Sequence, residues 1–187
     1  MGLEESMQGT APESVCEIAV RSFSNATGAD LPSTGADTMA SQLKEKPFLS
    51  LTRHFAAVPE KVWLAWTDPE ALKHWFGPDE GQVSLAQTDV RVGGRFHVVF
   101  STLDGEEHDV SGIYREVQPH RKLVFTWAWK STPERESLVT LTFSPSAGGT
   151  EFNVLHEQFF DVAARDRHEF GWTGALVKLS RFLQDKI

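Results

Sequence analysis

The stretch FAAVPEKVWLAWTDPEALKHW, from Phe55 to Trp75, says most about the fold of this chain. Pro59 stands where the first turn of a helix tolerates the missing N–H of proline, so a helix is predicted to begin there. The apolar residues that follow lie three or four positions apart, on one helical face; they are Val62, Trp63 and Trp66. A short helix with an aromatic face is typical of a binding fold rather than of a catalytic apparatus.

A second helix is predicted directly after the first. Asp68 is a favourable capping residue, and Pro69 fits the first helical position. Leu72, Trp75 and Phe76 then repeat the helical spacing. We therefore expect two short helices joined without a loop.

Beyond Phe76 the apolar pattern changes from helical spacing to the alternation that strands show. The alternating runs are 83–88, 94–102, 108–117, 122–129, 138–144 and 150–157. Turn signals separate consecutive runs, which predicts an antiparallel meander of hairpins. With one more strand at 48–55 and a closing helix at 162–185, the predicted topology is β-αα-β6-α, in the α+β class.

The closing helix carries an apolar stripe that must cover a sheet. The stripe consists of Trp172, Ala175, Leu176, Leu179, Phe182 and Leu183, while Lys178, Arg181, Gln184 and Asp185 are expected on the solvent side. Gly171 and Gly174 each cost a helix about 1 kcal/mol relative to Ala, so a compensating role is expected. Close packing against the sheet is the simpler explanation, and room for a ligand is the alternative.

Length and composition fit one globular domain with a polar tail before it. The chain has 187 residues, of which 40% are hydrophobic, and a formal charge of −8. Residues 1–46 are rich in Ser, Thr, Gly, Ala and acidic groups, so we expect a mostly disordered acidic tail there and the domain at 47–187. A translation start at Met39 is a further hypothesis, in which the residues before it are dispensable.

Charge and cysteine content exclude several classes of function. An acidic chain without a stripe of Lys and Arg lacks the footprint that phosphate backbones require, so no nucleic acid or membrane partner is expected. The sequence shows no apolar run near the ~20 residues that cross a bilayer and no signal peptide pattern. Cys16 is the single cysteine, so no intramolecular disulfide can form. We expect a soluble cytoplasmic protein, either a monomer or a homodimer formed through a sheet edge.

Several sequence blocks closely resemble the activator of Hsp 90 ATPase homologue-like family of the START and birch-pollen-allergen-like (SRPBCC) superfamily. The blocks are 59–76, 89–96, 112–114, 123–127, 149–150, His156 and 168–172. They keep their order and spacing from Phe48 to the C-terminus. The resemblance implies a helix-grip fold, in which a curved antiparallel sheet wraps around the long C-terminal helix. It also implies a space for apolar ligands between the two.

Aromatic side chains are the first candidates for lining such a cavity, because the chain has six Trp and thirteen Phe. The preferred candidates are Trp66, Trp75, Phe96, Trp127, Trp129, Phe152 and Trp172. His156 and His168, where the family pattern also has histidines, are candidates for orienting a ligand or for acid–base chemistry. Tying a strand to the helix is the more ordinary role for both.

Neither a metal centre nor a nucleophile is predicted. The histidines form no i, i+4 pair and no His-Glu-x-x-His run, and the sequence has no Gly-x-Ser-x-Gly elbow. No metal or cofactor is therefore expected. The segment Thr132 to Glu136 reads as a charged hairpin tip, and such loops can gate the mouth of a cavity.

Three functional hypotheses follow. The first is a carrier or sensor that binds a small apolar or aromatic ligand and has no catalytic residues. The second is a co-chaperone that binds Hsp 90, as the family name implies, although the tail is too short to replace the folded N-terminal domain of full-length activators. The third is a cyclase or aromatase acting on a polyketide-like molecule, with His156, His168 or Tyr114 as acid or base.

Overall fold

A computed structural model describes residues 46–185. The expectations for the acidic tail, Cys16 and Met39 lie outside this range. The elements in chain order are β1 (Leu49–Phe55), α1 (Pro59–Thr67), α2 (Pro69–Trp75), β2 (Val83–Thr88), β3 (Arg95–Ser101), β4 (Glu107–Gln118), β5 (Lys122–Trp129), β6 (Ser137–Ser146), β7 (Gly149–Glu157) and α3 (Val162–Asp185). This order confirms the predicted β-αα-β6-α topology.

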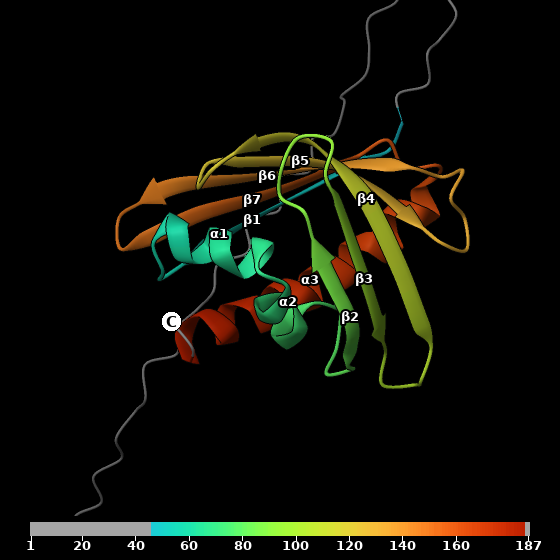
Figure 1. The fold of residues 1–187 in the computed structure, drawn as a ribbon, viewed down its shortest axis with the longest axis horizontal. Helices are drawn as coiled ribbons and strands as arrows, with labels where there is room; N and C mark the ends of the chain where they lie inside the picture. Colours follow the sequence, from blue (N-terminus) through green and yellow to red (C-terminus); the bar gives the residue numbers. More distant parts are fainter. Residues whose placement is uncertain (1–45, 186–187) are drawn as a thin grey trace, which may run out of the picture. The chain divides into compact units, whose positions relative to one another are not determined.

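The strands form a single antiparallel sheet in the order β1-β7-β6-β5-β4-β3-β2. Successive hairpins connect β2 to β7, and β1 pairs with β7 at one edge. The sheet curves strongly, so that β2, β3 and β4 descend around α3, which runs along the concave side (Figure 1). The helix-grip arrangement, a curved sheet around a long C-terminal helix, is thereby confirmed.

The bend of the sheet has local causes in β4. The pairing of β4 with β5 is irregular between Tyr114 and Glu116, and such a bulge increases bending and twist. Close to this point a Cβ atom on Gly112 would lie 1.7 Å from the carbonyl oxygen of Thr126. Only glycine allows the two backbones to approach this closely. The Thr126 hydroxyl also accepts a hydrogen bond from the Ile113 amide at 3.1 Å, where the regular ladder is interrupted.

The two short helices begin as the sequence predicts. Pro59 and Pro69 occupy the first helical positions, and the Asp68 carboxylate accepts a hydrogen bond from the Glu70 amide at 2.9 Å. Asp68 thus ends α1 and caps α2, which explains why no loop separates them. The Trp75 indole N–H donates to the Ala65 carbonyl at 2.9 Å and joins the two helices. Together they cover one end of the concave side, where α1 contacts β6 and β7 and α2 contacts β2 and α3.

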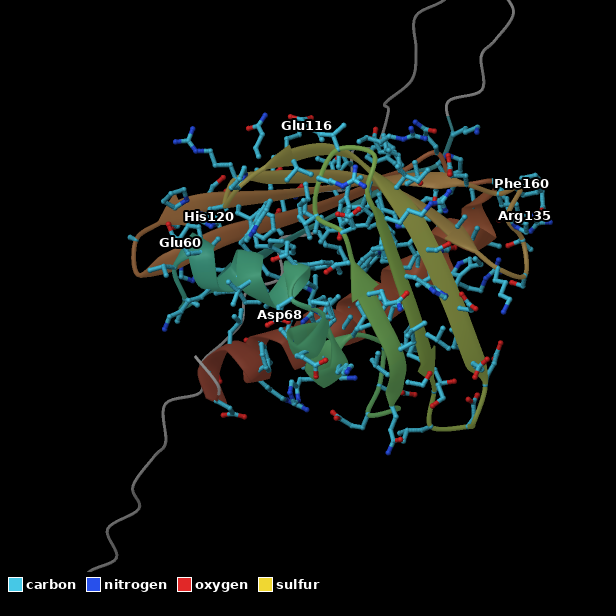
Figure 2. All side chains as sticks on the ribbon, in the orientation of Figure 1. Glu60, Asp68, Glu116, His120, Arg135 and Phe160 are labelled. Carbon is cyan, nitrogen blue, oxygen red and sulfur yellow. The ribbon has the colours of Figure 1, made fainter. Side chains whose placement is uncertain are left out.

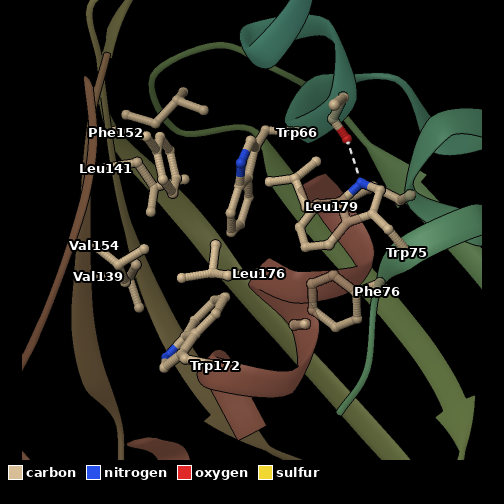
Figure 3. Packing of buried hydrophobic residues seen from close by; sticks show 14 of the residues in the cluster. Trp66, Trp75, Phe76, Val139, Leu141, Phe152, Val154, Trp172, Leu176 and Leu179 are labelled. Carbon is tan, nitrogen blue, oxygen red and sulfur yellow. Dashed lines mark hydrogen bonds between the residues drawn. The ribbon is translucent and has the colours of Figure 1, made fainter. Parts of the chain in front are cut away.

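The main core lies between α3 and the concave face of the sheet, beneath these helices (Figure 3). Trp66 stacks on Phe152 with ring centroids 5.4 Å apart and meets Trp75 edge-on at 4.6 Å. Leu176 and Leu179 of α3 are fully buried against the same cluster. The apolar stripe predicted for α3 therefore faces the sheet as expected, apart from Phe182, which is only partly buried.

Lys178 departs from the prediction, because it is not on the solvent side of α3. Its side chain is 8% exposed, and its ammonium group donates to the backbone carbonyls of Phe76, at 3.3 Å, and Asp79. The reason is that α3 has a second covered flank, formed by the connection between α2 and β2. The long aliphatic stem of lysine fits under this connection, and the charged end satisfies carbonyl groups that no strand or helix uses.

Candidate functional site

A cleft of about 1080 Å³ lies between the N-terminal half of α3 and the inner face of β3, β4 and β5. The residues that give it an aromatic wall are Phe76, Phe100, Trp127, Trp129, Phe159 and Trp172. It exists because α1 and α2 cover only one end of the concave side. Three of these side chains come from the sheet: Phe100 from β3, and Trp127 and Trp129 from alternate positions of β5, which point toward the helix.

Small residues of α3 line the cleft beside larger ones such as His168 and Trp172. Ala164, Gly171 and Ala175 all line it. Within the described part of the chain, a Cβ atom on Gly171 would have nothing within 4 Å, whereas one on Gly174 would lie 2.1 Å from the Pro78 carbonyl oxygen. Each of the two explanations expected for these glycines therefore applies to one of them. Gly174 permits close packing, and Gly171 leaves room in the cleft.

His156 lies in the core behind Trp127 and Trp172 of the cleft wall, fully buried in a chain of hydrogen bonds. The Trp172 indole N–H donates to Nδ1 of His156 at 3.0 Å, so Nδ1 carries no proton. Nε2 of His156 therefore carries the proton and donates to the Ser137 hydroxyl at 2.8 Å. That hydroxyl in turn donates to the Trp127 carbonyl at 3.2 Å. The chain ties β5, β6, β7 and α3 together.

His168 on α3 repeats this arrangement closer to the surface. The Trp129 indole N–H donates to Nε2 at 3.1 Å, and Nδ1 donates to the Ala164 carbonyl at 2.7 Å. The two imidazoles meet edge to face, with ring centroids 5.0 Å apart. Each imidazole thus uses one nitrogen to accept from a tryptophan of the cleft wall.

Both imidazoles are neutral. Burial holds the pKa of His156 well below its usual value of 6.5, and nearby His168 lowers it further. Burial also lowers the pKa of His168, against the opposing effect of its bond to Ala164. With both nitrogens of each ring engaged, neither histidine is prepared to exchange a proton with a ligand. Burial raises the pKa of Tyr114, the third candidate acid or base.

The candidate residues named from the sequence fall into three places. Those that line the cleft are Trp127, Trp129, His168 and Trp172. Those beside a separate interior void of about 20 Å³ are Trp66, Phe96 and Tyr114, with Trp127 reaching both spaces. Those in neither are Trp75, Phe152 and His156, which belong to the core. Contact of any of them with a ligand stays a prediction.

Sequence reasoning missed His108 and the aromatic residues between β7 and α3. His108 lines the cleft next to Phe100 and Trp129, and Phe159 lines it next to His168. The alternation of 108–117 could have indicated His108, because it shares the inward face of β4 with buried Val110 and Tyr114. Phe159 follows the last strand, where no periodic pattern assigns a side to a residue.

The rim of the cleft is charged and also exposes two phenylalanines. Arg135 lies over the Phe160 ring at 4.2 Å from its centroid (Figure 2), and Lys130 pairs with Asp109 at 3.1 Å. Phe160 is 63% exposed and Phe170 is 77% exposed. Arg135 belongs to the hairpin tip expected near the mouth of a cavity, and it does line this cleft.

Two negative findings concern residues 46–185 alone. No group of three or more His, Cys, Asp or Glu side chains among them is arranged to hold a metal ion. No helix of this part of the chain is long and apolar enough to cross a membrane.

The curved sheet, the gripped helix and the aromatic cleft define a helix-grip domain. The family described as activator of Hsp90 ATPase homolog 1-like protein matches residues 56–184. The chain belongs to this family.

Comparison with individual proteins gives the same picture. The human activator of 90 kDa heat shock protein ATPase homolog 1 is 27% identical over 125 residues, which are 66% of this chain and 33% of the human protein. The matched part of the chain thus spans about a third of that relative. The AHSA1 protein from Silicibacter pomeroyi is 30% identical, with a TM-score of 0.66 over 74% of this chain and 98% of its own. A protein from Nitrosomonas europaea is 26% identical, with a TM-score of 0.65 over 74% of this chain and 95% of its own.

Proposed function

We propose that the domain binds a small apolar or aromatic molecule in the cleft and acts as a carrier or sensor. The observation that carries this proposal is the size and lining of the cleft, about 1080 Å³ between tryptophan rings and a helix that lacks a side chain at Gly171. Pockets for small molecules in proteins usually enclose about 300–1000 Å³ and are mostly apolar.

The hydrogen bonds of the site support an apolar ligand. The indole N–H groups of Trp129 and Trp172 are used within the protein, as are the nitrogens of His156 and His168. Of these residues, the ones that line the cleft are Trp129, His168 and Trp172, and they therefore turn ring faces and carbon atoms toward it, not unpaired polar groups. Rigid aromatic faces offer a large contact area at a small loss of side-chain entropy on binding.

The proposal is tested by filling the cleft at Gly171. The chain and its Gly171→Leu variant are compared by native mass spectrometry and by thermal shift with sterol, fatty-acyl, flavonoid and polyketide ligands. We expect stabilisation that grows with ligand concentration for the unmodified chain and is lost in the variant. Val177→Leu, at an exposed position of the same helix outside the cleft, is the matched control.

Two outcomes would contradict the proposal. One is the absence of a retained mass or a thermal shift with all of these ligands. The other is equal stabilisation of the chain and of Gly171→Leu, since ligand would then bind elsewhere.

A second candidate function is a contact with Hsp90, as the name of the human relative describes for that protein. Family membership supports it, and so do the exposed rings of Phe160 and Phe170, because large exposed apolar side chains mark interaction surfaces. We expect purified Hsp90 to be retained by the chain and by Gly171→Leu but not by a Phe160→Ser, Phe170→Ser double variant. Equal retention of Hsp90 by the unmodified chain and both variants would contradict this second function.

A further inference from the structure

Among the described residues, His108 is held in the wall of the cleft by ring contacts and by an electrostatic interaction with Asp104. Its imidazole stacks on Phe100, with centroids 5.0 Å apart and planes at 26°, and lies 5.8 Å from the Trp129 ring. It is half-buried and points inward from β4, on the same face as Val110. Stacking covers a face of the ring, while the two nitrogens lie at its edge.

The nitrogens of His108 differ from those of the other two histidines near the cleft. Across residues 46–185, neither Nδ1 nor Nε2 of His108 has a hydrogen-bond partner in the protein, although the side chain lines the cleft. All ring nitrogens of His156 and His168 are bonded. The hydrogen-bonding capacity of the imidazoles at this site is therefore concentrated in His108.

The charges around His108 restrict what it can bind. Glu106, Glu107 and Asp109 line the same part of the cleft. Lys130 also lines the cleft, and it is already paired with Asp109 at 3.1 Å. The other cations of the lining, Arg135 and Arg167, lie on the rim loop and on α3 instead of on β4. An anionic ligand group would lie close to several carboxylates, which is unfavourable. A neutral imidazole offers one donor and one acceptor, and a hydroxyl group can use both.

We infer that His108 is the polar anchor of the cleft, and that the ligand is an uncharged aromatic alcohol. The ring system of this ligand lies against Trp127, Trp129 and the bare backbone at Gly171, and the hydroxyl group of the ligand forms a hydrogen bond with His108. This inference rests on the proposed function and adds the chemical class of the ligand and the residue that selects it.

The test uses two probes of nearly equal shape, 2-naphthol and 2-methylnaphthalene, which differ in a hydroxyl against a methyl group. Binding is measured by isothermal calorimetry for the full chain, for His108→Phe and for His74→Phe. His108→Phe keeps the ring that stacks on Phe100 and removes the nitrogens. His74→Phe is the matched control, because His74 also stacks on a phenylalanine, Phe182, at 5.5 Å, but lies outside the cleft.

We expect His108→Phe to weaken 2-naphthol binding about fivefold, the typical value of one hydrogen bond, and to leave 2-methylnaphthalene within about twofold. His74→Phe should change neither. His108→Gln, which restores a donor and an acceptor, should recover part of the 2-naphthol affinity.

Other outcomes overturn the inference in distinguishable ways. An equal loss for both probes in His108→Phe would mean that the ring is only part of the wall. Binding of 2-naphthoate as tight as that of 2-naphthol would overturn the exclusion of anions. If 2-methylnaphthalene binds and His108→Phe has no effect on either probe, the cleft binds ligands but His108 is not their polar anchor. If neither probe binds, the result contradicts the proposed function as well.

Discussion

The tryptophan residues of this domain differ in what their indole N–H groups do. Those of Trp129 and Trp172 donate to histidines, and that of Trp75 donates to a backbone carbonyl. Those of Trp66 and Trp127 are buried and have no partner within the described residues. A buried donor without a partner costs about 1–3 kcal/mol, so tryptophans of similar burial should tolerate substitution differently.

Trp172→Phe should destabilise the domain more than Trp127→Phe. Both changes remove similar ring volume, but the first leaves Nδ1 of buried His156 without its donor. The second removes an N–H that has no partner among residues 46–185. The expected difference in the free energy of unfolding is about 1–3 kcal/mol. Urea unfolding followed by far-UV circular dichroism measures it. Equal losses would show that the Trp172–His156 bond contributes little.

The stability of the domain should fall as the pH falls below about 6.5. Burial lowers the pKa values of His156 and His168, so below the usual value of 6.5 the unfolded chain binds more protons than the folded one. Acidification then favours unfolding, by up to about 1.4 kcal/mol per pH unit for each histidine, and this loss is absent above that range. Urea midpoints between about pH 7.5 and 5.5 test the effect. His156→Gln should remove one histidine's part of the slope, and a flat profile in the unmodified chain would contradict the prediction.

The sequence predicted correctly on which face of a strand or helix a residue lies wherever a local pattern determines that face. The alternation in β5 places Trp127 and Trp129 inward, and the helical spacing places Trp172 toward the sheet. Which ring nitrogens find partners depends on residues far apart in the chain, such as Trp129 and His168. For this reason the sequence suggested His156 and His168 as polar candidates and did not single out His108.

Among the elements, the boundaries of the strands and helices were predictable because turns and caps are local. Asp68 with Pro69, and the turn residues between the strands, fix the ends to within about two residues. Lys178 shows the limit of this approach, because its burial depends on the connection between α2 and β2 lying across α3. Helical spacing alone cannot indicate a second covered flank.

Alanine at Gly171 and at Gly174 should have opposite effects on α3. Gly171→Ala should stabilise the domain by up to about 1 kcal/mol, because alanine favours the helix and the new methyl group projects into the cleft. Gly174→Ala should destabilise it by about 1–3 kcal/mol, because the methyl group would overlap the backbone at Pro78. Thermal unfolding of the two variants tests this, because the unfolding temperature should rise for Gly171→Ala and fall for Gly174→Ala. A shift of both temperatures in the same direction would contradict the packing described here.

For the molecule as a whole, the cleft results from the unequal coverage of one curved sheet. The helices α1 and α2 fill one end of the concave side, and the N-terminal half of α3 meets the other end across the aromatic wall (Figure 1). The resemblance to the family predicted this space, and the alternating pattern of the strands only permitted it. The cytoplasmic location, the oligomeric state and the boundary between tail and domain stay predictions.

The boundary between tail and domain can be tested by removing residues 1–45. The buried core described here lies entirely between Leu49 and Leu183, and Pro47 already contacts the domain through the bond from the Phe159 amide to its carbonyl, at 3.2 Å. We therefore expect the shortened chain to unfold at the same urea concentration as the full chain and to bind 2-methylnaphthalene with the same affinity. A lower midpoint would show that the first 45 residues stabilise the domain. An unchanged midpoint with altered affinity would show instead that they influence access to the cleft without contributing to the fold.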